Sequence, residues 1–188
     1  TYRFLLCPEN IGAAAFLSNE GDHLLKNLKG GYILNCLGYG NQWTYKHSRR
    51  HNSLADMAAF NVINNESCKK EFINFFPDGS DERQFCSPGF NFPIGLIMRF
   101  MYNSFPEYHT SADNKDLISF ELLKESISLY FRVLMTLEID CIPFAKIQKG
   151  SPMLSKSSIP LYRDMMNFRQ VDKDKETRII LEILNLAD

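Results

Sequence analysis

The sequence has 188 residues, of which 45% are hydrophobic and 23% charged, and its formal net charge is −1. This composition is typical of a globular protein with one domain, or with one domain and an appendage. A net charge near zero argues against a general attraction to nucleic acid or acidic membranes, and no stretch is apolar for long enough to cross a bilayer.

Five cysteines are spread along the chain without any C-x-x-C pair. An odd number without paired spacing argues against a disulfide framework and against a cysteine-rich zinc knuckle. Reduced thiols are the simplest explanation, so we expect a cytoplasmic protein. Because the chain begins without Met and inside an apparent strand, we also expect the natural N-terminus to lie upstream.

The first half of the chain alternates between strand and helix patterns. Apolar and aromatic residues predict a buried strand over Tyr2–Cys7, and helical periodicity follows over Ile11–Leu28. A second buried strand is predicted over Tyr32–Leu37 and a short edge strand over Thr44–His47. The helix predicted over Ser53–Asn64 begins with a Ser followed three residues later by Asp, which is close to a capping box.

The second half continues the alternation. A short strand is predicted over Glu71–Phe76, followed by a polar loop over Pro77–Gly89 and another strand over Phe92–Phe100. Ser104–Ser119 is polar and irregular. The longest helix is predicted over Ser119–Leu137, with its first residue as N-cap.

Strands that alternate with helices indicate an α/β fold, a mixed β-sheet flanked by helices. The character changes after about residue 142, because Phe144–Arg169 is basic and loop-like before a helix begins over Lys173–Leu186. We therefore assign residues 1–142 to one domain and residues 143–188 to a linker that enters a second, small domain.

Three polar segments are candidates for chemistry. Glu9 directly follows the first predicted strand, where open α/β folds bind ligands, although a charge at a helix N-terminus is the alternative. His109 lies in a polar loop with Asp113 four residues later, a pattern that fits a metal ligand and its orienting carboxylate or a solvated loop. The segment G-S-D-E-R-Q-F-C-S-P-G is either a polar lid or a surface turn.

These segments together resemble a known family. Y-H-T-S-A-D-N resembles the Y-H-T-P-x-D-T segment of zinc aminopeptidases of the leucine-aminopeptidase and glutamate-carboxypeptidase type. G-S-D-E-R-Q-F-C-S-P-G-F-N-F-P resembles their S-D-H-x-P-F-x-x-x-G-I-P segment, and Y-R-F-L-L-C-P-E-N-I-G resembles the strand that carries the catalytic Glu. The chain is most similar to the aminopeptidase-like branch found beside polysaccharide-biosynthesis genes, and the resemblance covers about residues 1–140.

The resemblance implies a partial zinc-exopeptidase-like (phosphorylase/hydrolase-like) domain followed by the start of a winged-helix domain. It implies Glu9 as the catalytic base and His109 as a zinc ligand. The family's adjacent carboxylates are here Glu9-Asn10, and its next ligand strand reads Leu34-Asn35-Cys36. Cys36 is either a thiolate ligand or an inert buried thiol. We therefore expect one zinc ion in the full-length protein, and weak or absent metal binding by this stretch alone, because the other ligands would precede Thr1.

The surroundings of the metal site, or substrate binding, are assigned to five further residues: Asp81, Glu82, Arg83, Tyr108 and Asp113. Arg83, with Glu82, either reaches a carboxylate or phosphate of the substrate or pairs with Asp81. Tyr108 either donates a hydrogen bond to a developing oxyanion or packs beside the neighbouring His. Asp113 either orients its loop or forms an Asx turn.

A basic cluster that includes Lys46, Arg49 and Arg50 is interpreted as a solvated turn, with a site for a substrate anion as the alternative. His47 and His51 show no partner pattern and are expected at the surface.

Two functions follow from the resemblance. The first is a zinc-dependent hydrolase that cleaves amide or peptide bonds, with a peptide or a small amide-bearing molecule as substrate. The second is a non-catalytic binding module with an aminopeptidase fold, linked to polysaccharide biosynthesis. Neither function involves a membrane or nucleic acid, and homo-oligomerisation stays open.

Overall fold

The computed structural model describes residues 1–140 and 171–186. The chain divides into two compact units, Thr1–Ile139 and Asp140–Asp188. In the second unit the described part is helix α5 (Val171–Leu186), which begins two residues before the predicted helix. The predicted basic loop over residues 144–169 lies outside the described residues. No described helix is long and apolar enough to span a membrane.

The first unit contains a four-stranded sheet and four helices. The strands are β1 (Gly31–Leu34), β2 (Gln42–Lys46), β3 (Lys69–Ile73) and β4 (Ile94–Met98), and the helices are α1 (Ile11–Asn27), α2 (Leu54–Asn64), α3 (Glu82–Phe85) and α4 (Phe120–Ile139). The strand order is β1-β4-β2-β3. Strand β4 runs parallel to β1 and antiparallel to β2, and β2 is parallel to β3. The predicted mixed sheet is confirmed.

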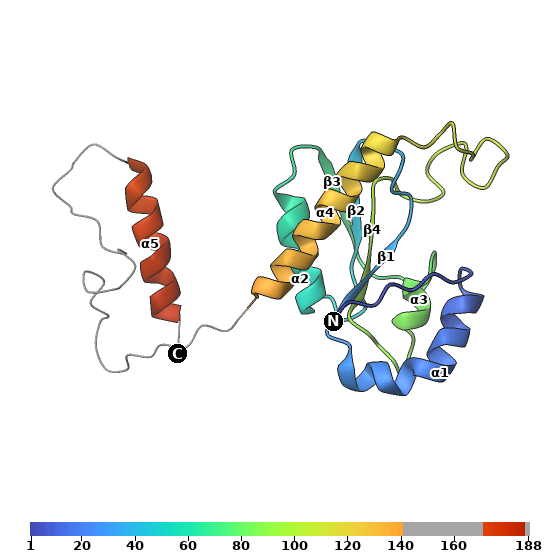
Figure 1. Ribbon diagram of the computed structural model, residues 1–188, viewed down its shortest axis with the longest axis horizontal. Coiled ribbons are helices and arrows are strands. Elements are labelled where there is room, and N and C mark those ends of the chain that lie inside the picture. The colour runs from blue at the N-terminus through green and yellow to red at the C-terminus, as the bar shows by residue number, and fades with distance from the viewer. Residues whose placement is uncertain (141–170, 187–188) are drawn as a thin grey trace. The chain divides into compact units, whose positions relative to one another are not determined.

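Helices cover both faces of this sheet (Figure 1). Helices α2 and α4 pack on one face, and α1 and α3 lie on the other. Successive residues of a strand point to opposite faces, so Ile97 joins the core under α2 and α4 whereas Ile94 joins the core under α1 and α3. The outer edge of β1 pairs with no other described strand.

The helix starts on the α2/α4 face follow from local sequence. The Ser53 side chain accepts a hydrogen bond from the backbone N–H of Asp56, and the Asp56 carboxylate accepts one from the backbone N–H of Ser53. This is the predicted capping box. At the start of α4 the Ser119 hydroxyl accepts a hydrogen bond from the Leu122 N–H at 3.3 Å. Both predicted N-caps are confirmed.

The strand predicted over Tyr2–Cys7 does not form. This segment is exposed, and the Leu6 side chain has a relative exposure of 98%. A strand requires a neighbour that completes its backbone hydrogen bonds, and no described strand pairs with this one. Side chains hold it instead, through the Tyr2 hydroxyl, which donates to Glu138 at 2.6 Å, and an ion pair between Arg3 and Glu20 at 2.9 Å.

A strand does form near Thr44–His47, but the prediction that it lies at the edge of the sheet is wrong. Strand β2 lies between β4 and β3, and all five of its residues are buried. Its polar residues suggested exposure, but Lys46 pairs with the buried Glu82 and is only 1% exposed. His47 likewise stacks on His51, with ring centroids 4.7 Å apart, and its side chain is largely buried.

Candidate functional site

Two segments about seventy residues apart in sequence meet before the first turn of α1. The Ser80 hydroxyl donates a hydrogen bond to Glu9 Oε1 at 2.8 Å. The Asn10 backbone N–H donates to Asp81 Oδ1 at 2.6 Å, and Arg83 Nε donates to Asn10 Oδ1 at 2.8 Å. Glu9 itself is exposed. The loop before α3 therefore fixes the carboxylate of Glu9 while leaving it open to solvent.

Asn10 has an unusual backbone conformation, with φ of 59° and ψ of −60°. Non-glycine residues with positive φ are uncommon and persist where surrounding contacts fix them. Here the contacts to Asp81 and Arg83 hold both the backbone and the side chain of Asn10. The strained turn and these hydrogen bonds together determine where the preceding carboxylate points.

A buried charge network supports this loop from the side of the sheet. Lys46 Nζ lies 2.9 Å from Glu82 Oε1 and 2.9 Å from Asp78 Oδ1. It also donates to the Tyr102 hydroxyl at 3.2 Å. Glu82 is fully buried, so it binds the lysine and does not reach the solvent side where Glu9 lies. Neither Lys46 nor this role of Glu82 was anticipated from sequence, because a lysine in a polar strand is usually solvated.

The protonation of this network follows from its geometry. Burial alone would lower the pKa of Lys46, but its hydrogen bonds to Glu82 and Asp78 outweigh burial and raise that pKa. Burial also raises the pKa of Glu82, against the opposing effect of Lys46. The pKa values of Lys46 and Glu82 can both be raised. Glu82 Oε2 is buried and has no hydrogen-bond partner among the described residues, which disfavours the ionised carboxylate. The Lys46 ammonium group has hydrogen-bond acceptors, which favour its charged form.

The loop that carries His109 is held by aromatic packing. Tyr39 contacts Phe100 and Phe105, with ring centroids 5.8 Å and 5.1 Å apart, and Phe105 contacts Tyr108 at 5.4 Å. Such pairs add stability beyond their buried area. The loop after β4 is thereby tied to the loop after β1, at the carboxyl ends of two parallel strands.

His109 is exposed and has a φ of 58°. Its ring stacks on Tyr108, with centroids 4.0 Å apart and an interplanar angle of 12°. No hydrogen bond or ion pair joins His109 to another residue in the described part of the chain. Tyr108 thus has the packing position foreseen as the alternative to an oxyanion donor.

The Tyr108 phenol in this loop is a weaker acid than a free tyrosine. Burial raises its pKa, and the Glu9 and Asp113 carboxylates raise it further. The Asp113 carboxylate makes no hydrogen bond with a described residue, and the Asx turn in this loop belongs to Asn114, whose Oδ1 accepts from the Asp116 N–H at 2.8 Å.

The described residues do not provide a complete metal site. No group of three or more His, Cys, Asp or Glu side chains within residues 1–140 and 171–186 is arranged to hold a metal ion. Cys36 donates a hydrogen bond to Asn35 Oδ1 at 3.2 Å, and burial raises its pKa to about 11. A thiol with a raised pKa is a poor source of thiolate in the absence of a metal ion.

Sequence reasoning had separated residues that the fold joins. Ser80 and Asn10 both contact the neighbourhood of Glu9, yet neither was a candidate for the site. The signal that was available is the Ser-Asp pair inside the G-S-D-E-R-Q segment, since short polar side chains before a helix often bind backbone N–H groups. Arg83 was expected to bind either a substrate anion or Asp81, and it binds Asn10 instead.

Comparison with known proteins places this geometry in a family. A family model described as "Domain of unknown function (DUF4910)" matches residues 1–140. A protein of Clostridium acetobutylicum, whose name refers to polysaccharide biosynthesis and to an aminopeptidase-like domain, is 38% identical over 159 residues. That match covers 85% of this chain and 36% of the relative.

Solved structures agree with the sequence match. The crystal structure of a protein from Clostridium acetobutylicum, named as a peptidase, has a TM-score of 0.78 and 31% identity, over 96% of this chain and 38% of that chain. A zinc aminopeptidase from Bacillus subtilis has a TM-score of 0.55 and 14% identity, over 66% of this chain and 32% of its own.

An aminopeptidase from Aneurinibacillus sp. strain AM-1 has a TM-score of 0.56 and 18% identity, over 68% of this chain and 30% of its own. At these identities the two aminopeptidases show the fold alone. The chain spans less than two fifths of the length of the relatives it matches. It belongs to the DUF4910 family, and its first unit has the fold of the zinc aminopeptidases.

Proposed function

We propose that this chain supplies part of the active site of an amide-bond hydrolase of the aminopeptidase type, within a longer protein. The observation that supports the proposal most is the fixed, solvent-open carboxylate of Glu9. Ser80 holds one of its oxygens, and the strained turn at Asn10 fixes its direction. A carboxylate that is held in place but open to solvent is suited to take a proton from an attacking water and to pass it to the leaving amine.

The substrate in this proposal is a peptide or a small molecule that carries an amide. His109 is the residue of this chain that we assign to zinc binding, because its segment matches the family motif. The described residues do not complete a metal site, so in this proposal the other ligands come from outside residues 1–140 and 171–186. The proton-transfer role proposed for Glu9 is the same whichever residues supply the remaining zinc ligands.

A second candidate is a non-catalytic binding module. One observation favours it: Arg83 Nε donates to the carboxamide oxygen of Asn10, at the position where the resemblance to zinc aminopeptidases implies a second carboxylate. A module that only binds an amide-bearing ligand would need neither a proton acceptor nor a metal ligand, yet the chain carries both Glu9 and His109.

The deciding experiment measures hydrolysis of aminoacyl p-nitroanilides by a longer protein that contains this chain. Glu9→Gln should lower the rate roughly 10²- to 10⁴-fold, because the proton acceptor is lost, and should leave the zinc content unchanged. His109→Ala should lower the zinc content. Glu20→Gln, at an exposed carboxylate on α1 that pairs with Arg3, is the matched control and should change neither. Absence of hydrolysis by the unmodified protein across the substrate panel would support the binding module instead.

A further inference from the structure

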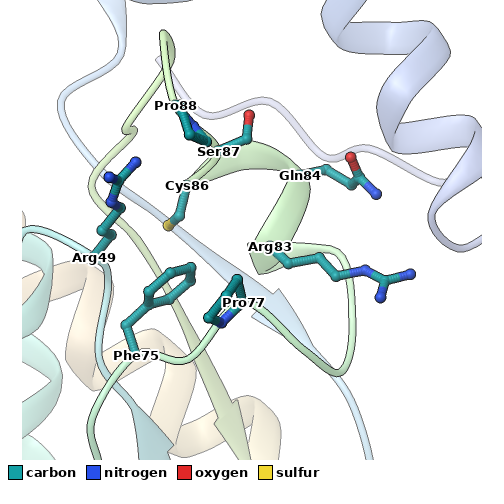
Figure 2. Close-up of a pocket in the computed structure, with 8 residues that line it drawn as sticks. All are labelled: Arg49, Phe75, Pro77, Arg83, Gln84, Cys86, Ser87 and Pro88. Atoms are coloured by element: carbon teal, nitrogen blue, oxygen red, sulfur yellow. The ribbon is translucent and has the colours of Figure 1, made fainter.

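A cavity of about 600 Å³ lies beside α3, and its wall includes Arg83, which also contacts Asn10. It is bounded by α3 and the turn after it, by the segment between β3 and α3, and by the turn after β2 (Figure 2). Small-molecule sites in proteins commonly have volumes of about 300–1,000 Å³. The cavity is therefore large enough to receive a small organic ligand.

Most of the cavity wall is apolar. Phe75 and Pro77 line one side, and Pro88 lies on the other side (Figure 2). The Cys86 thiol also lines it, but the thiol donates to the carbonyl oxygens of Phe92 and Ile94, at 3.4 Å and 3.3 Å. Burial raises the pKa of Cys86, so this residue offers packing surface rather than a nucleophile.

One cationic side chain of this wall is available to a ligand. Arg49 is exposed and forms no ion pair with any carboxylate in the described part of the chain. Arg83 lines the cavity with its stem, but its guanidinium points away from the other labelled residues (Figure 2), and its Nε donates to Asn10. The acidic groups nearest in sequence to this wall, Asp78 and Glu82, are bound by Lys46.

We propose that this cavity binds a small molecule with a flat apolar body and one carboxylate or phosphate group. The apolar body lies against Phe75 and Pro77, and the anionic group pairs with the guanidinium of Arg49, whose fork geometry suits both anions. The Ser87 hydroxyl lines the same cavity and is free to donate a further hydrogen bond, since no described residue pairs with it. The site is separate from the proposed proton acceptor and does not depend on hydrolytic activity.

The 188-residue chain can be titrated with benzoate, phenyl phosphate, inorganic phosphate and benzyl alcohol, with backbone amide NMR shifts as the readout. We expect at least one of the two aromatic anions to bind saturably and to shift the amides of Arg49 and Ser87. Which of them binds more tightly distinguishes a carboxylate site from a phosphate site. Inorganic phosphate and benzyl alcohol should each bind at least about tenfold more weakly, because each lacks half of the recognition.

Arg49→Ala should weaken binding of the aromatic anion roughly tenfold or more, since it removes a charge-assisted hydrogen bond. Arg50→Ala is the matched control, because Arg50 is the adjacent arginine but donates from Nε to the Asn91 carbonyl oxygen and does not line the cavity. Arg49→Lys keeps the charge without the fork and should have an intermediate effect. The proposal is overturned if neither aromatic anion saturates, if benzyl alcohol binds as tightly, or if the two alanine variants lose affinity equally.

Discussion

Each face of the sheet has an apolar core, but the face under α1 and α3 also holds a buried ion pair. Under α2 and α4, buried apolar side chains such as Ile97 and Leu129 form a continuous core. On the opposite face the strand β2 presents Lys46 to Glu82 of α3, and the candidate site lies at the margin of this polar contact. The comparison shows that apolar packing organises both faces, whereas the residues of the candidate site are positioned in addition by hydrogen bonds between loops.

The sharpest test of this difference is Lys46→Ala. Removal of the lysine leaves Glu82 buried without its partner, and we expect the free energy of unfolding to fall by about 3–5 kcal/mol. Urea denaturation measures the change. The double variant Lys46→Met with Glu82→Leu should regain most of the lost stability, because no unpaired charge then remains. A loss below about 1 kcal/mol for the single variant would contradict a buried ion pair.

The apolar face should respond to Leu129→Ala with a loss of about 3 kcal/mol, in the range for fully buried leucines. The matched control is Ile127→Ala on the same helix, whose side chain is 71% exposed, and it should change stability by no more than about 0.5 kcal/mol. The amide NMR shift of Asn10 should stay unchanged in both variants. A moved Asn10 resonance in Leu129→Ala would show that the two faces are coupled.

A smaller effect is expected in acid through Asp56. Burial by itself would raise the pKa of Asp56, but hydrogen bonds from Ser48, Ser53 and Tyr45 outweigh burial and hold this pKa below its usual value. A carboxyl with a lowered folded-state pKa stabilises the fold above its unfolded pKa of about 3.9, and this contribution is lost as the pH falls through the folded value.

Stability should therefore fall below about pH 4. Asp56→Asn should lower stability near neutral pH by about 1–2 kcal/mol, as loss of a helix cap does, and should flatten the acid decline. Asp22→Asn, at an exposed carboxylate in α1, serves as the control and should leave the decline intact. Urea unfolding between about pH 2.5 and pH 7 measures both variants, and an unchanged acid slope in Asp56→Asn would assign the decline to other groups.

The smallest effect on stability is expected for Arg83→Ala, at about 0.5–1 kcal/mol, because its hydrogen bond to Asn10 is only partly buried. Arg83→Ala should also change the geometry of the turn at Asn10, and the amide NMR resonance of Asn10 should therefore shift. Arg132→Ala removes an exposed ion pair to Glu66 at 2.5 Å on the α2/α4 side and should leave that resonance in place. Equal shifts in both variants would mean that Arg83 does not specifically hold the turn.

The same difference explains which parts of the fold were predictable. The capping box at Ser53 and the long helix α4 follow from patterns within one segment, and both were predicted. The short helix α3 was missed inside the predicted loop Pro77–Gly89, because one helical turn has no detectable periodicity. The predicted strand Tyr2–Cys7 failed because the apolar pattern signals a strand without showing whether a partner strand is present.

The candidate residues of the site were proposed from motifs, but their arrangement could not be predicted. Glu9 and Asp81 were both proposed from motifs, yet their link through Ser80 and Asn10 depends on one positive-φ turn. Periodicity carries no information about such a turn. The burial of Lys46 depends on acceptors that arrive from Asp78 and Glu82, and a local pattern cannot show contacts that distant in sequence.

The outer edge of β1 has a consequence for the colloidal behaviour of the chain. Unpaired backbone groups along a strand edge are a template on which another copy can add a strand. The Leu34 side chain at this edge is 60% exposed, and the apolar residues Phe4 and Leu6 are exposed as well. Concentrated samples of the chain should therefore scatter light through edge-to-edge association, and Leu34→Lys, which places a charge on the edge, should raise the concentration at which this begins.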